Sequence, residues 1–181
     1  MNSIQQLRTG IRYIPAFILF FFMSTLYAQH NAVAPTDGFI VSGIVKNTLK
    51  LNIKDLLRLK QDDLGDVAIK NQRGEEKGVA KQIKGVSLKA ILDSAEIFAD
   101  KPKEFSEFYI VLTASDEYTN VYSWNELYNT EVGKHVYVVT EMDGKSIDQM
   151  PDRILVLSLA DLNSGRRHLK GLAKIEVKKV N

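Results

Sequence analysis

The sequence predicts an α+β fold in which mixed, mainly antiparallel β-sheets carry short helices. Segments with the pattern of strands outnumber helical ones, and the helical segments are short. The composition, 45% hydrophobic and 25% charged residues, is typical of a folded globular protein. A chain of 181 residues can bury a core without disulfides or metal. We find no internal repeat and no linker inside the second part of the chain, which indicates one main domain.

Residues 1–28 differ from the rest of the chain and predict a signal peptide. Arg8 and Arg12 are their only charged residues, and an almost wholly apolar stretch then ends at Ala28. A basic start, a short apolar run and a small closing residue are typical of secretory signals. The alternative is a permanent anchor, but the run is shorter than the ~20 residues that cross a bilayer. We therefore expect a periplasmic or secreted protein that meets the membrane only during export.

Residues 29–37 are small and polar and predict a linker, so the folded domain is expected over residues 38–181. Without the two signal-peptide arginines, the mature chain has 22 basic and 22 acidic residues. A neutral chain gains little from attraction to polyanions, so we expect no binding to nucleic acid. The chain has no cysteine, which excludes disulfides, thiolate metal sites and cysteine nucleophiles.

The first half of the domain predicts two short helices among strands. Asn52 is suited to cap a helix over Ile53–Arg58, which has an acidic first turn and a basic end. A second helix is expected to start within Gly85–Leu88, because apolar residues then recur at spacings of three and four. Strands are expected where β-branched and aromatic residues gather, at Phe39–Val45, Val67–Lys70 and Val79–Ile83.

The second half predicts four strands and one more helix. Ser123 and Glu126 match a capping box, which indicates a helix over Trp124–Tyr128. The alternating segment Ala173–Lys178 predicts a strand with one buried face, and Ile154–Leu159 predicts a strand covered on both faces. The other strands are expected at Phe108–Ala114 and Val136–Thr140, with Asp143-Gly144 as a turn before Ile154–Leu159.

Motifs that mark common enzyme classes are absent from the sequence. It has no glycine-rich dinucleotide loop, no phosphate-binding loop and no nucleophile elbow. Residues 62–66 are acidic but lack the alternating ligands and the glycine of a calcium site, so they predict a solvated loop. The histidines are scattered, which argues against a histidine metal site; they are His30, His135 and His168.

Four short motifs follow one another along residues 38–180. They are Gly38–Val45 with Asp55-Leu56-Leu57, Gly85-Val86-Ser87-Leu88 with Ile91-Leu92, Ala114–Tyr118 with Tyr122-Ser123 and Glu126-Leu127, and Arg167–Lys170 with Lys174–Val177. In this order they resemble the molybdopterin-binding domain of the sulfite-oxidase-type oxidoreductases. The resemblance implies an α+β fold with a groove that, in the enzymes, holds a pterin with its phosphate and a molybdenum centre.

The chain departs from the family's pattern at the residue that binds the metal. The resemblance implies a cysteine ligand between Val67 and Gly85, but this segment is short here and has no cysteine. Oxygen or nitrogen ligands cannot replace a soft thiolate without changing the chemistry of the metal. We therefore expect a molybdopterin or another pterin as ligand, and no molybdenum. Glu117 stands where the family has glycine, so a turn that needs positive φ would be strained there.

The run Gly165–Lys170 is the strongest candidate for ligand contact. If it is extended, Arg166, His168 and Lys170 share one face and Arg167 lies on the other. Such groups can hold a phosphate, and arginine offers a paired hydrogen-bond fork. The resemblance places Arg167 and Lys170 on the pterin side of the groove. The alternative is an exposed strand edge whose charges deter pairing with other chains.

A second candidate is the aromatic segment at residues 116–124. Asp116 can accept hydrogen bonds from the amino groups of a flat heterocycle, and Tyr118 can stack on it. The alternative is a structural turn closed by Asp116, with Tyr122 and Trp124 packed in the core, and for these three residues we favour the alternative.

The sequence thus predicts an exported protein that binds a pterin or a similar flat anionic ligand and performs no molybdenum redox chemistry. Its partner is expected to be this small anionic or heterocyclic molecule. One alternative is an active molybdenum-cofactor oxidoreductase with a non-cysteine ligand set and a periplasmic redox partner. Another is a non-catalytic accessory or interaction domain, because one fold hosts many functions.

Overall fold

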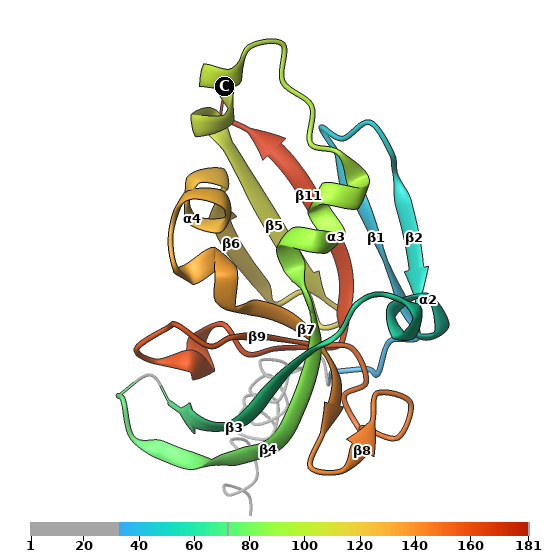
Figure 1. The fold of residues 1–181 in the computed structure, drawn as a ribbon, viewed down its shortest axis with the longest axis vertical. Helices are drawn as coiled ribbons and strands as arrows, with labels where there is room; N and C mark the ends of the chain where they lie inside the picture. The colour runs from blue at the N-terminus through green and yellow to red at the C-terminus, as the bar shows by residue number, and fades with distance from the viewer. Residues whose placement is uncertain (1–32, 72, 181) are drawn as a thin grey trace, which may run out of the picture. The chain divides into compact units, whose positions relative to one another are not determined.

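The computed structural model describes residues 33–71 and 73–180, which form two β-sheets and several short helices (Figure 1). The predicted signal peptide and the first part of the predicted linker lie outside the described residues. The predicted α+β class, with mainly antiparallel sheets and short helices, is confirmed. Over the described ranges, no helix has the length and apolar character needed to cross a membrane.

The first sheet has five strands in the order β2-β1-β11-β5-β6. Its strands are β1 (Gly38–Gly43), β2 (Leu49–Asn52), β5 (Phe108–Ala114), β6 (Thr119–Ser123) and β11 (Leu172–Lys179). The first and last strands of the domain, β1 and β11, pair in parallel, and all other pairs in this sheet are antiparallel. The parallel pair therefore joins the two ends of the described chain at the centre of the sheet.

The second sheet has six strands in the order β10-β9-β7-β4-β3, with β8 paired to β7. All its pairs are antiparallel. Its strands are β3 (Asp62–Lys70), β4 (Glu76–Ser87), β7 (Val136–Met142), β8 (Lys145–Ser146), β9 (Leu155–Ser158) and β10 (Leu169–Lys170). Strand β9 is buried throughout, as its apolar sequence predicts.

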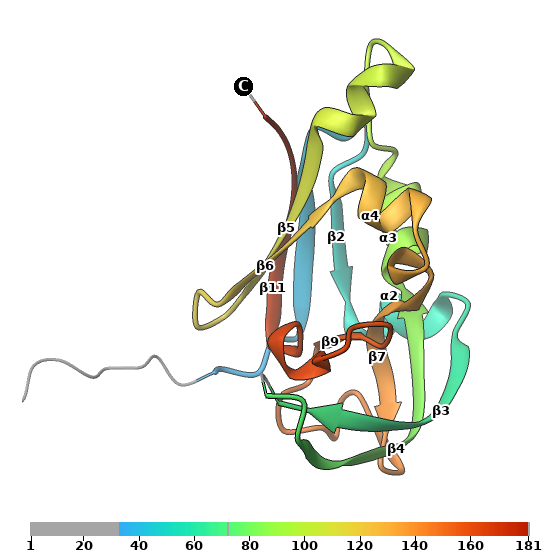
Figure 2. The ribbon, with the colours of Figure 1, turned by 90° about the vertical axis from the view of Figure 1, so that its left-hand side faces the viewer.

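Within residues 33–71 and 73–180, three α-helices connect the strands: α2 (Ile53–Arg58), α3 (Leu88–Ala95) and α4 (Trp124–Asn129). Helix α2 begins with a reciprocal cap, in which the Asp55 N–H donates to Asn52 Oδ1 and the Asn52 N–H donates to Asp55 Oδ2, both at 3.1 Å. Helices α3 and α4 lie along one face of the five-stranded sheet (Figure 2). The 3₁₀ helices are η1 (Pro102–Glu107), η2 (Val132–His135) and η3 (Ser164–Arg166).

One hydrophobic core joins both sheets and the helices. The apolar face of α3 is fully buried, as the sequence spacing predicts. The inner faces of β1, β5 and β11 contribute alternate residues, because side chains on a strand point to opposite faces in turn. The main contributors are Val41, Leu88, Ile91, Leu92, Ile110, Leu112, Val138, Val156, Ile175 and Val177.

The structure corrects four local predictions. The segment Gly85–Ser87 ends β4 instead of starting α3, because Gly85 pairs with Val139 of β7. Strand β6 was not predicted, and residues 62–66 belong to β3 and not to a loop, since their pairing with β4 extends the strand. The Asp143-Gly144 turn, in which both residues have positive φ, joins β7 to the unpredicted β8 and does not lead directly into β9.

The end of the predicted linker lies against the domain. The Ala34 N–H donates to Ser115 Oγ at 3.0 Å, and the same hydroxyl donates to the Ala34 carbonyl at 2.7 Å. Asp37 forms an ion pair with Arg153. The chain is therefore held at the end of β5 before it enters β1.

The turn between β5 and β6 gives a prediction for stability. Glu117 has a φ of +70°, a conformation that glycine adopts without steric cost. We expect Glu117→Gly to raise the free energy of unfolding by about 0.5–1 kcal/mol in urea titrations. Glu131→Gly is the matched control, because Glu131 has a φ of −62° and the change is expected to lower stability. A loss of stability in Glu117→Gly would contradict the strained turn.

Candidate functional site

A cleft of about 370 Å³ lies where the two ends of the six-stranded sheet approach each other. Strand β3 is one edge of this sheet, and η3 lies just before β10, the other edge. Two residues of the cleft wall are joined across it, because the Lys70 N–H donates to Ser164 Oγ at 3.1 Å. A Cβ on Gly165 would lie 2.6 Å from the Lys70 carbonyl oxygen, so glycine permits this close approach.

The walls of the cleft combine apolar and charged side chains. They are Asp66, Val67, Ala68 and Lys70 of β3, and Leu159, Asp161, Leu162 and Ser164 of the segment after β9. Leu162 stands at the rim with 89% of its surface exposed. A concave, largely apolar site with a few polar groups is the usual form of a small-molecule site. Lys70 lies in the segment where the resemblance implies the metal ligand.

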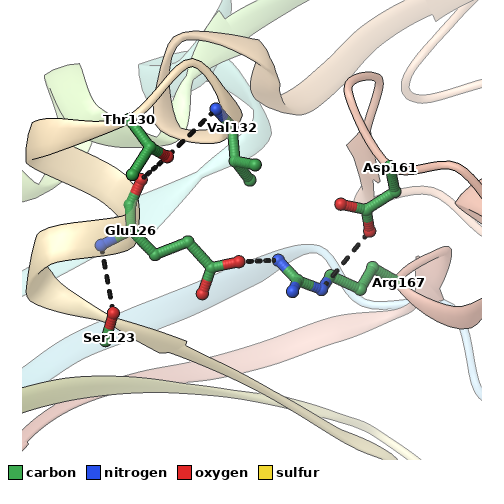
Figure 3. Close-up of polar contacts among 6 residues, drawn as sticks. All are labelled: Ser123, Glu126, Thr130, Val132, Asp161 and Arg167. Carbon is green, nitrogen blue, oxygen red and sulfur yellow. Dashed lines mark hydrogen bonds and ion pairs between the residues drawn. The ribbon is translucent and has the colours of Figure 1, made fainter.

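Arg167 lies between two carboxylates from different parts of the chain (Figure 3). Its Nη1 is 2.6 Å from Glu126 Oε1 of α4, and its Nε is 3.3 Å from Asp161 Oδ2 on the cleft wall. The guanidinium also lies over the Tyr122 ring of β6, at 4.5 Å from its centroid. The three charged side chains are only 15–28% exposed. Arg167 therefore joins α4, β6 and the cleft wall.

Glu126 is positioned by the start of α4. The Glu126 N–H donates to Ser123 Oγ at 3.0 Å, as predicted for a helix cap. The Glu126 side chain does not return to the cap, as a complete capping box requires, but points to Arg167 (Figure 3). The Thr130 hydroxyl donates to the Glu126 carbonyl at 2.8 Å and secures the other end of this short helix.

Two hydroxyl groups are buried beside this network. Tyr122 and Ser158 are fully buried, and neither hydroxyl has a hydrogen-bond partner among the described residues. Burial raises the pKa of Tyr122 to about 12, although the positive charge of Arg167 acts in the opposite direction. Neither side chain lines the cleft, so these hydroxyls belong to the interior behind Arg167.

Residues 165–170 are not extended throughout, so the shared face considered for an extended run does not form. Residues 164–166 form η3, and only Leu169 and Lys170 form a strand, because the chain must turn to bring Ser164 against β3. Arg166 is exposed and has no ion pair among the described residues. Lys170 pairs with Asp152 at 2.7 Å, and Arg167 is bound by two carboxylates. Of the three cations in this run, Arg166 alone has no ion pair with a residue that the structure describes.

His168 is mostly buried, and its Nε2 atom has no hydrogen-bond partner among the described residues. Burial lowers the pKa of His168 to about 4, with a smaller contribution from Lys170, so the ring is neutral at pH 7. It is therefore not a cationic contact for a phosphate at that pH.

Asp116 and Tyr118 take the structural role that the alternative describes. Asp116 Oδ1 accepts a hydrogen bond from the Tyr118 N–H at 3.1 Å in an Asx turn. The Tyr118 hydroxyl donates to the Arg166 carbonyl at 2.5 Å, which fastens the β5–β6 turn to η3. Tyr122 is buried, and Trp124 stacks between Phe105 and Tyr128. Neither Asp116 nor Tyr118 lines the cleft.

Sequence reasoning missed the residues that line the cleft. Asp161 and Lys70 come from distant segments, and neither stands in a recognisable motif. Glu126 was identified as a capping residue and as part of a family motif, but not as a partner of Arg167. The one signal in the sequence is Gly165, because glycine permits a close backbone approach, and here that approach is to Lys70 of β3.

The residues of the cleft do not fit a thiolate-bound molybdenum. The sequence has no cysteine, and the cleft offers two carboxylates and one ammonium group instead. Across residues 33–71 and 73–180, no three His, Asp or Glu side chains are grouped to hold a metal ion. We therefore assign no step to molybdenum. The carboxylates, the ammonium group and the Ser164 hydroxyl of the cleft wall are hydrogen-bonding groups that an organic heterocycle can use.

Comparison with solved structures finds the same fold in a known enzyme. The chain is similar to the sulfane dehydrogenase SoxCD from Paracoccus pantotrophus, with a TM-score of 0.57 and 14% sequence identity. The match covers 79% of this chain and 39% of the SoxCD chain. No protein-family model and no curated protein sequence matches the chain. The similarity confirms the molybdopterin-binding type of fold, and at this identity it shows the fold alone.

The ion pairs of Arg167 predict a large effect on stability. Arg167→Met keeps an aliphatic side chain over Tyr122 but leaves Glu126 and Asp161 without their partner. We expect the free energy of unfolding to fall by about 2–3 kcal/mol, since unpaired, partly buried carboxylates are costly. Arg166→Met is the control, because Arg166 is exposed, and a change below about 0.5 kcal/mol is expected. Equal effects in both variants would contradict the stabilising role of the Arg167 ion pairs.

His168 predicts a pH dependence of stability. Its pKa in the folded chain, about 4, lies below the usual value of 6.5, so the unfolded chain binds the proton more readily. The neutral, buried ring of His168 therefore contributes to the free energy of unfolding in full above pH 6.5, and this contribution is lost as the pH falls towards 4. Between pH 7.5 and 4.5 we expect wild type to lose about 2–3 kcal/mol more than His168→Gln in urea titrations. His135→Gln, at an exposed ring, should follow wild type.

Proposed function

We propose that the mature chain is an exported binding protein that holds a pterin, or a similar flat anionic heterocycle, in the cleft between β3 and residues 159–164. The observation that carries this proposal is the cleft itself, on a fold of the molybdopterin-binding type. Its volume of about 370 Å³ lies in the usual range for small-molecule sites. The basic and apolar N-terminal segment supports export to the periplasm or beyond.

The residues of the cleft support a flat ligand with polar edges. Val67, Ala68 and Leu159 offer apolar surface to the faces of a ring system. Lys70 has no ion pair among the described residues and lies at the cleft, so it supplies the nearest cation for one acidic group. Arg166, the last residue of η3, is a second cation of this region without an ion pair among the described residues.

The same residues argue for binding over redox catalysis. A molybdenum centre supplies the redox chemistry in the enzymes that the fold resembles, and the thiolate that tunes such a centre has no counterpart here. The side chains that line the cleft offer hydrogen bonds, one ammonium group and apolar surface, which bind and orient a ligand. None of these side chains is redox-active.

The proposal is tested on protein purified from its own host. We expect the mature chain to begin at Gln29 and to release about one heterocyclic molecule per chain on denaturation, identified by mass spectrometry and pterin fluorescence. Ala68→Trp fills the cleft and should lower the retained ligand at least tenfold. Ala90→Trp, at an exposed site on α3, is the matched control and should keep it. No retained ligand, together with no binding of added pterins, would refute the proposal.

A further inference from the structure

We infer that Asp161 sets the specificity of the cleft for a heterocycle that presents two adjacent N–H donors, as a 2-amino-4-oxopyrimidine ring does. This inference rests on the proposed function and states which edge of the ligand one side chain recognises. Asp161 lies on the cleft wall with 15% of its side chain exposed. A carboxylate has two oxygens and can accept two parallel N–H groups from a planar partner.

The ion pair of Asp161 leaves acceptor capacity at its carboxylate. Its Oδ2 lies 3.3 Å from Arg167 Nε, and because each carboxylate oxygen has two lone pairs, this contact does not prevent both oxygens from accepting N–H groups of a ligand. Arg167 in turn is held by Glu126 at 2.6 Å and by the Tyr122 ring. Asp161 is therefore fixed in orientation by a rigid neighbour, and Glu126 and Arg167 act as positioning residues for it.

The charges of the cleft favour a ligand that presents N–H donors over a ligand with several negative charges. Asp66 and Asp161 contribute two negative charges, and Lys70 contributes one positive charge. Asp66 already accepts the Gln82 N–H at 2.9 Å, and it belongs to the exposed part of β3. Asp161 is the more desolvated of the two, so a hydrogen bond to it discriminates more strongly between a donor and an acceptor.

The experiment compares two ligands that differ only at this edge. Pterin-6-carboxylate has a 2-amino group, whereas lumazine-6-carboxylate has a 2-oxo group that turns a donor into an acceptor. Both are titrated into ligand-free mature protein and followed by fluorescence. We expect wild type to bind the 2-amino compound at least tenfold more tightly, because the 2-oxo group faces a carboxylate. Asp161→Asn should bind both compounds within about threefold, since an amide can donate to the 2-oxo group.

Controls separate this inference from the proposed function. Asp148→Asn, at an exposed aspartate outside the cleft, should keep the wild-type preference. Thermal unfolding shows whether Asp161→Asn is folded, and the comparison on wild type needs no variant. If wild type binds neither compound, the pterin proposal fails. If it binds both equally, or if Asp161→Asn keeps the wild-type preference, only the role of Asp161 is refuted.

Discussion

The ion pairs of Arg167 are the interaction on which the candidate site depends. Glu126 stands on a helix that follows β6 of the first sheet, whereas Asp161 follows β9 of the second sheet. One guanidinium therefore connects segments of both sheets at a partly buried position. Such a pair does not add much stability relative to an apolar contact, but the loss of one partner is costly. The network thus holds the cleft wall in one arrangement.

The cleft follows from the way in which the second sheet curls. Its two edge strands, β3 and β10, do not pair with each other. However, η3 contacts the end of β3 through the hydrogen bond between Lys70 and Ser164. The sheet is thereby nearly closed at one end and open along the rest of β3. An open strand edge is usually covered or charged, because it can pair with other chains. Here the segment after β9 covers part of it and leaves a space that a ligand can occupy.

Patterns among neighbouring residues predicted the helix caps and turns correctly. They could not predict which side chains from distant segments form ion pairs. The caps at Asn52 and Ser123, the buried face of α3 and the Asx turn at Asp116 depend on residues within four positions, and all are confirmed. The strain expected at Glu117 also appears, as a positive φ. By contrast, Arg167 was taken for a free cation, because its partner Glu126 lies 41 residues away and no local pattern reveals such a pair.

This pairing changes which ligands the site can favour. A run of Arg, Arg, His and Lys suggests a strong anion site when it is read as sequence. In the folded chain, Arg167 and Lys170 face carboxylates, and His168 is neutral at pH 7 because burial lowers its pKa. Charge that is already compensated attracts a phosphate much less than free charge does. Because Arg167 and Lys170 are paired and Lys70 is the one cation on the cleft wall, the proposed recognition depends on the hydrogen-bonding edges of a ligand more than on its charge.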